Sequence, residues 1–163
     1  MFEEILGIPA HPLLVHAAVV FVPLAAASAI AYALVPYVRR YTAWLVVGLA
    51  VIAPVTAWVT KMSGDAFRAR LIRHGAHDPV FLGKIDVHMG FGQKTEYWAL
   101  GLGVVMLLLV FLPTLRANAP AGPLTNMVAR VVLMVLAVGV AGATGYYVFR
   151  TGDTGAHIVW SGQ

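Results

Sequence analysis

The stretch "IPAHPLLVHAAVVFVPLAAASAIAYALVPYV", residues 8–38, decides the class of fold. Two histidines, His11 and His16, stand near its start, and the rest is almost wholly apolar. About 20 consecutive apolar residues are enough to cross a bilayer as a helix. We therefore predict a membrane-spanning helix over about 12–38, with a stop near Pro36.

The whole chain has the composition of an integral membrane protein. Of its 163 residues, 60% are hydrophobic and 11% are charged, whereas about 25% of the residues in soluble domains are charged. The net charge of +4 is interpreted as loop charge facing lipid headgroups, not as a nucleic-acid site. Because there is no cysteine, disulfides, thiolate metal sites and thiol catalysis are excluded.

Three more apolar stretches follow the first. They predict spans over about 41–60, 86–112 and 128–149, with a tail over 150–163. A single all-α domain, an up-and-down four-helix membrane bundle, is the expected fold. In the polar segment between the second and third spans, Phe67 and Leu71 lie four residues apart and predict a short helix on the membrane surface. The alternative is a solvated loop helix.

Charged residues and histidines divide unequally between the two ends of such a bundle. All six histidines and all seven acids fall at the end that holds both termini. The other end has arginines and no acid: Arg39, Arg40, Arg116 and Arg130. Since Arg39 and Arg40 adjoin two spans, we expect the arginine end in the cytoplasm of a bacterium and both termini outside its plasma membrane.

Small residues in the last two spans predict close helix packing. "ALGLGVV" holds Gly101 and Gly103, and "AVGVAGATGYY" holds Gly139, Gly142 and Gly145. Such spacing lets helix backbones approach each other in lipid. No internal sequence repeat is evident.

His16 and His88 are the first candidate pair of cofactor ligands. A helix starting near Ile85 places His88 and Gly92 on one face, and Gly92 leaves room above the imidazole. The first and third helices of an up-and-down bundle run parallel, so the two rings would project from the same end, as the axial ligands of haem b do. One observation opposes this pairing. Along its helix, His88 lies about five residues farther from the arginine end than His16 does, a difference of roughly 7 Å.

The remaining histidines are weaker candidates. His11 precedes a proline, and we expect it outside the regular helix, either folded over His16 or serving as a cap. His74 and His77 are three residues apart, a spacing that can bind a metal on a helical turn, but a surface loop is the favoured interpretation. Asp153 and His157 in the tail are candidate metal ligands together with the three histidines of the spans. No hydrolase, phosphate-loop or nucleotide motif is present.

Three segments together resemble the bacterial membrane family called domain of unknown function 2231. They are "HPLLVH" in the first span, "HMGFG" in the third and "TGDTGAHIVW" after the fourth. The resemblance implies a four-helix membrane protein and carries onto these positions: His11, His16, His88, Gly92, Gly152, Asp153, Gly155 and Trp160. Many relatives have an aromatic residue where this chain has Ala17. Relatives joined to c-type cytochromes or respiratory proteins imply a redox setting.

Three functions remain open from the sequence. The first is binding of haem b, or another redox centre, for electron transfer with a c-type cytochrome or respiratory complex as partner. The second is a cofactor-free accessory subunit of a larger membrane complex. The third is binding or passage of a transition-metal ion through His11, His16, His88, Asp153 and His157. A homo-oligomer is compatible with each of them.

Overall fold

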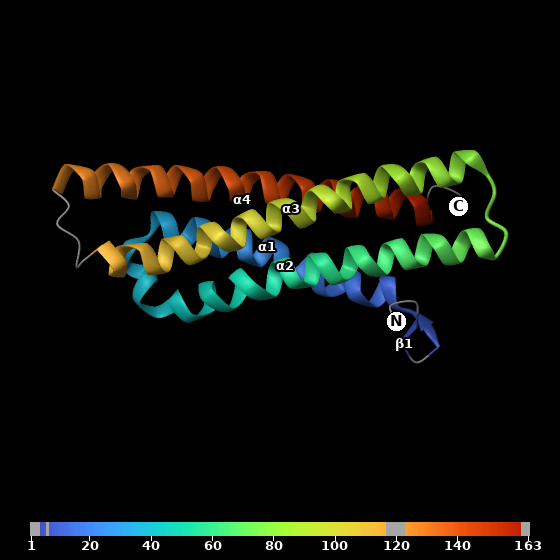
Figure 1. The fold of residues 1–163 in the computed structure, drawn as a ribbon, viewed down its shortest axis with the longest axis horizontal. Coiled ribbons are helices and arrows are strands. Elements are labelled where there is room, and N and C mark those ends of the chain that lie inside the picture. Colours follow the sequence, from blue (N-terminus) through green and yellow to red (C-terminus); the bar gives the residue numbers. More distant parts are fainter. Residues whose placement is uncertain (1–3, 6, 117–122, 161–163) are drawn as a thin grey trace.

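Four long helices form most of the described chain (Figure 1). The computed structural model describes residues 4–5, 7–116 and 123–160. The helices are α1 (Ala10–Leu34), α2 (Pro36–Arg73), α3 (Pro79–Arg116) and α4 (Pro123–Trp160). A small antiparallel hairpin of β1 (Glu4–Ile5) and β2 (Ile8–Pro9) precedes α1. The predicted four-helix architecture is confirmed.

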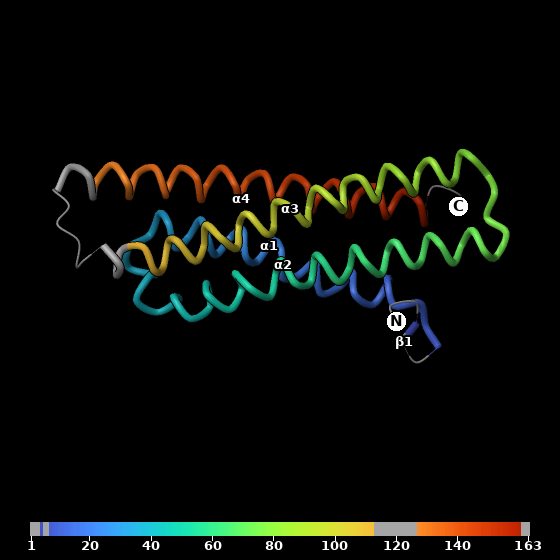
Figure 2. Tube along the Cα trace, viewed as in Figure 1, coloured from blue at the N-terminus to red at the C-terminus, as the bar shows by residue number. Residues whose placement is uncertain are grey.

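The helices form an up-and-down bundle. α1 packs on α2 and α4, α3 packs on the same two helices, and α1 also touches α3 across the bundle. Figure 2 shows the start of α1, the α2–α3 connection and the end of α4 toward the same end of the molecule. We call this the histidine end, because it holds His11, His74 and His157.

All four helices are long and apolar enough to cross a membrane. Large hydrophobic side chains point outward from them, such as Val20 (58% exposed) and Val135 (66% exposed), as expected for helices surrounded by lipid. α2 has 38 residues and is therefore about 57 Å long, against roughly 30 Å of hydrocarbon in a bilayer. The polar parts of α2 and α3 consequently extend past the hydrocarbon at the histidine end.

One expected break in helical structure is absent, and the last helix is longer than expected. The segment expected as a separate surface helix, residues 64–75, is helical as far as Arg73, but as an uninterrupted continuation of α2. The predicted tail over 150–163 is helical as far as Trp160, because α4 continues through Gly152 and Gly155. Glycine weakens a helix by only about 1 kcal/mol, so interhelical packing can keep these residues helical.

The first helix ends earlier than predicted. Val35 adopts an extended conformation before Pro36, as residues preceding a proline tend to do. The Arg39 side chain donates hydrogen bonds to the carbonyls of Tyr32 (2.8 Å) and Ala33 (2.5 Å). This arginine therefore satisfies carbonyl groups at the end of α1.

The α2–α3 connection is short and locally encoded. Gly75 follows α2 with φ of +95°, a conformation that suits glycine, and its amide donates to the carbonyl of Ile72. The Asp78 carboxylate accepts hydrogen bonds from the amides of Val80 and Phe81, at 3.0 and 3.3 Å. Gly75 thus ends α2, and the Asp78 side chain caps the start of α3.

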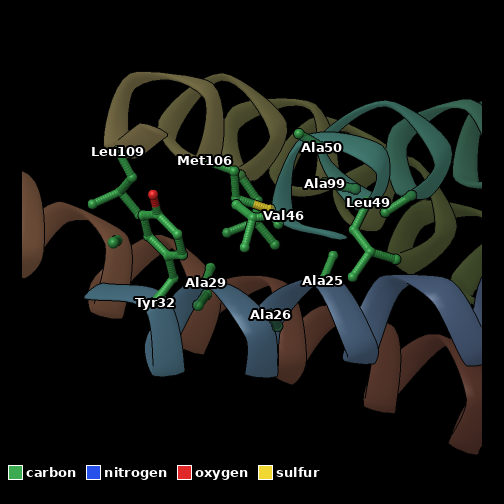
Figure 3. Packing of buried hydrophobic residues seen from close by; sticks show 14 of the residues in the cluster. Ala25, Ala26, Ala29, Tyr32, Val46, Leu49, Ala50, Ala99, Met106 and Leu109 are labelled. Carbon is green, nitrogen blue, oxygen red and sulfur yellow. The ribbon is translucent and has the colours of Figure 1, made fainter. Parts of the chain in front are cut away.

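The bundle core is built largely from alanine, with a few larger side chains between (Figure 3). Ala25 and Ala29 of α1 are fully buried, as are Leu102 and Met106 of α3. The predicted glycine packing is realised at Gly103, where an added Cβ would lie 2.5 Å from the carbonyl oxygen of Ala50 on α2. The other four predicted glycines, Gly101, Gly139, Gly142 and Gly145, would meet no atom of the described chain within 4 Å. Alanine, more than glycine, permits the close packing.

Candidate functional site

His11 lies in the first turn of α1 and reaches across to α2. Its Nδ1 is 3.1 Å from the carbonyl oxygen of Thr60 and 3.0 Å from the hydroxyl of Ser63. The ring lies against Gly64, where an added Cβ would be 3.1 Å from the imidazole Cε1. The ring also stacks on Phe67, with centroids 6.2 Å apart. The expectation that His11 lies outside the helix is wrong.

His88 on α3 makes the same set of contacts with α4. Its Nδ1 is 3.0 Å from the carbonyl oxygen of Thr151 and 3.2 Å from the hydroxyl of Thr154. An alanine Cβ at Gly155 would be 3.0 Å from the His88 Cε1. A hydroxyl, a carbonyl and a glycine of the neighbouring helix therefore hold each of the two imidazoles.

The two sets of contacts repeat a sequence pattern. Each partner helix carries a Thr-x-x-(Ser/Thr)-Gly run: Thr60, Ser63 and Gly64 on α2, and Thr151, Thr154 and Gly155 on α4. The contacts of His11 between α1 and α2 are therefore equivalent to those of His88 between α3 and α4. The repeat consists of a few residues separated by long intervals, so a search for contiguous similarity does not detect it.

The two imidazoles meet between the halves. The ring centroids of His11 and His88 are 6.3 Å apart, with planes at 77°. Both rings are partly buried. The structure thus brings together two histidines from diagonally opposite helices at one end of the bundle.

His16 does not take part in this pair. Its side chain is exposed, and its Nδ1 bonds the carbonyl oxygen of Pro12 on its own helix, at 2.7 Å. The expectation that His16 faces His88 is therefore wrong, because His11 occupies that place. The offset of about five residues between His16 and His88 pointed to this outcome, since His11 lies five residues before His16.

The other predicted site residues are not members of the ring pair. Gly92 packs toward α4, where an added Cβ would be 3.9 Å from Thr151 Cγ2. Asp153 and His157 pair with each other one turn apart on α4, at 3.5 Å, and His157 is 75% exposed. Within residues 4–5, 7–116 and 123–160, no three His, Asp or Glu side chains form a metal-binding group.

The hydrogen bonds determine which ring nitrogen of His11 carries the proton. The Ser63 hydroxyl donates to the Thr60 carbonyl at 2.7 Å, so both oxygens near the His11 Nδ1 are acceptors. Nδ1 must then donate its hydrogen, which leaves the lone pair on Nε2.

The same argument applies to His88. The Thr154 hydroxyl donates to the carbonyls of Arg150 (2.8 Å) and Thr151 (3.1 Å). Both histidines are thus held in the tautomer that binds metals or accepts protons through Nε2.

Sequence reasoning missed the residues that hold the rings. Thr60, Ser63 and Gly64 gave no motif by themselves, and Thr151 and Thr154 lie in the quoted segment "TGDTGAHIVW" but were not chosen as site residues. The signal was the recurrence of Thr-x-x-(Ser/Thr)-Gly at the histidine end of the second and fourth helices, which is visible once the helices are paired.

Comparison with protein families agrees with this architecture. Residues 7–163 match a family described as "Predicted membrane protein (DUF2231)". This chain belongs to that family. The match confirms the resemblance seen in the sequence and, with the four apolar helices, identifies an integral membrane protein. Searches of curated proteins and of solved structures found no match for this DUF2231 chain.

Proposed function

We propose that His11 and His88 would hold one haem b between them, and that the protein transfers electrons at the histidine end. The observation that carries the proposal is the facing pair of imidazoles, each with Nδ1 held by a carbonyl of the neighbouring helix. Haem requires only two protein ligands, because the porphyrin supplies the other four nitrogens. The pair is therefore a complete donor set for this group.

The separation of the rings fits a shared iron. Metal–imidazole bonds are about 2.0–2.1 Å and a ring centre lies roughly 1.1 Å from its nitrogens, so imidazoles on opposite sides of one ion have centres about 6.3 Å apart. The observed separation is 6.3 Å. A metal centre held by both rings would need this separation, which edge-to-face ring contacts also show.

The residues of the chain prepare the ligands. When bound, haem supplies one-electron redox chemistry. The Nδ1–H bonds to Thr60 and Thr151 orient the rings and raise the basicity of Nε2, as second-shell carbonyls do at metal sites. Gly64 and Gly155 leave room for each ring against the neighbouring helix. A group at one end of the bundle suits exchange with an extramembrane partner, and we propose a c-type cytochrome or respiratory complex on the outer side of a bacterial plasma membrane.

A second candidate is a cofactor-free accessory subunit, in which the same hydrogen bonds only join the helices. The bonds from His11 to α2 and from His88 to α4 favour this alternative, because each links two helices of the bundle. A transition-metal ion bound by the ring pair is the third candidate.

Optical spectra and metal analysis of the purified protein distinguish these functions. We expect a Soret band and a reduced-minus-oxidised α band in the wild type, lost in His11→Ala and in His88→Ala. His16→Ala is the matched control and should keep both bands, because His16 is exposed and contacts only its own helix. Bands absent from protein made in haem-replete cells would exclude haem. Stoichiometric metal without these bands would favour the transition-metal site. A colourless, metal-free protein whose histidine variants are unstable would favour the accessory subunit.

A further inference from the structure

A second cluster at the histidine end pairs cations with aromatic rings on α3 and α4. The Lys94 Nζ lies 5.6 Å from the centre of the Phe91 ring and 5.8 Å from that of Tyr147. The Arg150 guanidinium carbon lies 5.0 Å from the centre of the Phe91 ring. Two positive charges from different helices therefore gather at one aromatic side chain.

These charges are only partly balanced by the protein. Arg150 pairs with the carboxylate of Asp153 only at 3.9 Å, and Asp153 is shared with His157. Glu96 is close enough to Lys61 on α2 for their charges to interact, and within the described chain Lys94 contacts rings, not carboxylates. The Arg150 Nε is buried and has no hydrogen-bond acceptor among the described residues. The cluster thus has spare positive charge and an unsatisfied donor.

The position of the cluster matches the level of lipid headgroups. Lys94 precedes the apolar part of α3, which begins at Tyr97, and Arg150 directly follows the apolar part of α4. Aromatic side chains at the same level are exposed: Tyr97 (62%), Trp98 (38%), Tyr146 (56%) and Phe149 (69%). Aromatic belts of this kind mark the boundary between hydrocarbon and headgroups.

We propose that Lys94 and Arg150 bind the phosphate of an anionic phospholipid at the α3–α4 face. Phe91 and Tyr147 hold the two cations near each other, and Trp98 and Tyr146 lie beside the upper part of the acyl chains. Charge complementarity selects an anionic lipid, because a zwitterionic headgroup offsets its phosphate with its own cation. The proposal does not depend on a cofactor between His11 and His88.

Lipid binding to the purified full chain tests the site. Native mass spectrometry would compare phosphatidylglycerol with phosphatidylcholine of the same acyl chains. We expect the wild type to prefer phosphatidylglycerol, and Lys94→Gln/Arg150→Gln to bind it roughly 30-fold more weakly, from about fivefold for each cation. Lys84→Gln, which removes an exposed lysine of α3 outside the cluster, should retain the preference. The charge-conserving pair Lys94→Arg/Arg150→Lys should also retain it.

Two outcomes would overturn the proposal. One is equal binding of the two lipids by the wild type, or an unchanged preference in the double glutamine variant. The other is inorganic phosphate competing with phosphatidylglycerol at equal concentrations, which would identify a site for free anions instead of lipid. If the double glutamine variant does not fold, the charge-conserving pair Lys94→Arg/Arg150→Lys provides the test. Loss of the lipid preference in this pair, with the preference kept in Lys84→Gln, would contradict recognition by charge alone.

Discussion

At the scale of single residues, the site depends on two glycines as much as on two histidines. Gly64 and Gly155 are the points at which the imidazoles lie on the neighbouring helix. Neither glycine has a positive φ that would require it, so space for the ring is the physical reason for glycine here. Ser63 is completely buried, which makes its hydrogen bonds to Thr60 and His11 costly to lose.

Gly155→Ala should displace the His88 ring and destabilise the fold. The new Cβ would lie 3.0 Å from Cε1 and 3.3 Å from Nδ1, and overpacking of this kind costs about 1–3 kcal/mol. Gly152→Ala on the same helix is the matched control, because its Cβ would meet nothing within 4 Å and alanine favours a helix by up to about 1 kcal/mol. The free energy of unfolding in detergent measures the difference. Equal stability of the two variants would show that the ring moves aside freely.

At the scale of elements, the helices end where local sequence dictates and meet where small residues allow. Gly75 and Asp78 confine the α2–α3 connection to a few residues, so that α2 and α3 both extend beyond the hydrocarbon. Within the membrane, Gly103 lets α3 lie close to the backbone of α2 at Ala50. The contact matters because lipid offers no hydrophobic driving force between helices, and close packing supplies the attraction.

Gly103→Ala should separate α2 from α3. Its Cβ would lie 2.5 Å from the Ala50 carbonyl oxygen, a backbone atom that cannot rotate away, so we expect a loss of about 1–3 kcal/mol. Gly101→Ala, two residues earlier and facing open space, should be neutral or slightly stabilising. Thermal unfolding in one detergent compares the two. A Gly103→Ala protein as stable as Gly101→Ala would argue against this helix contact.

At the scale of the whole molecule, each of the two helical hairpins, α1–α2 and α3–α4, contributes one histidine to the ring pair. Alternating helix directions bring the start of α1, the α2–α3 connection and the end of α4 to one end of the bundle (Figure 1). All six histidines belong to this half of the molecule, as the sequence predicted. We propose that this end faces outward from the cell, because Arg39 and Arg40 stand at the opposite end beside two spans.

Cysteine labelling tests this orientation, and the natural chain provides a background without cysteine. His77→Cys lies in the exposed α2–α3 connection, and Tyr37→Cys at the opposite end replaces a side chain that is 67% exposed. In intact cells a membrane-impermeant thiol reagent should modify His77→Cys and leave Tyr37→Cys unmodified until the cells are opened. The reverse pattern would invert the proposed topology.

Much of the architecture could be predicted from sequence because its causes are local. The apolar lengths predict four spans, and the distribution of histidines predicts the end that they share. The same local reasoning failed at residues 64–73, expected as a separate surface helix, and at residues 150–160, expected as a tail after the fourth span. There the helices continue because they pack on long neighbours, an effect that hydropathy does not report.

The sequence alone therefore determined the membrane class, the number of helices and the end at which the histidines lie. Only the tertiary structure decided that His11, and not His16, meets His88, and that Gly64 and Gly155 hold the rings. The physical reason is rotation: residues five apart on a helix point in directions about 140° apart. Which of the two faces the bundle depends on how α1 packs against α2 and α4.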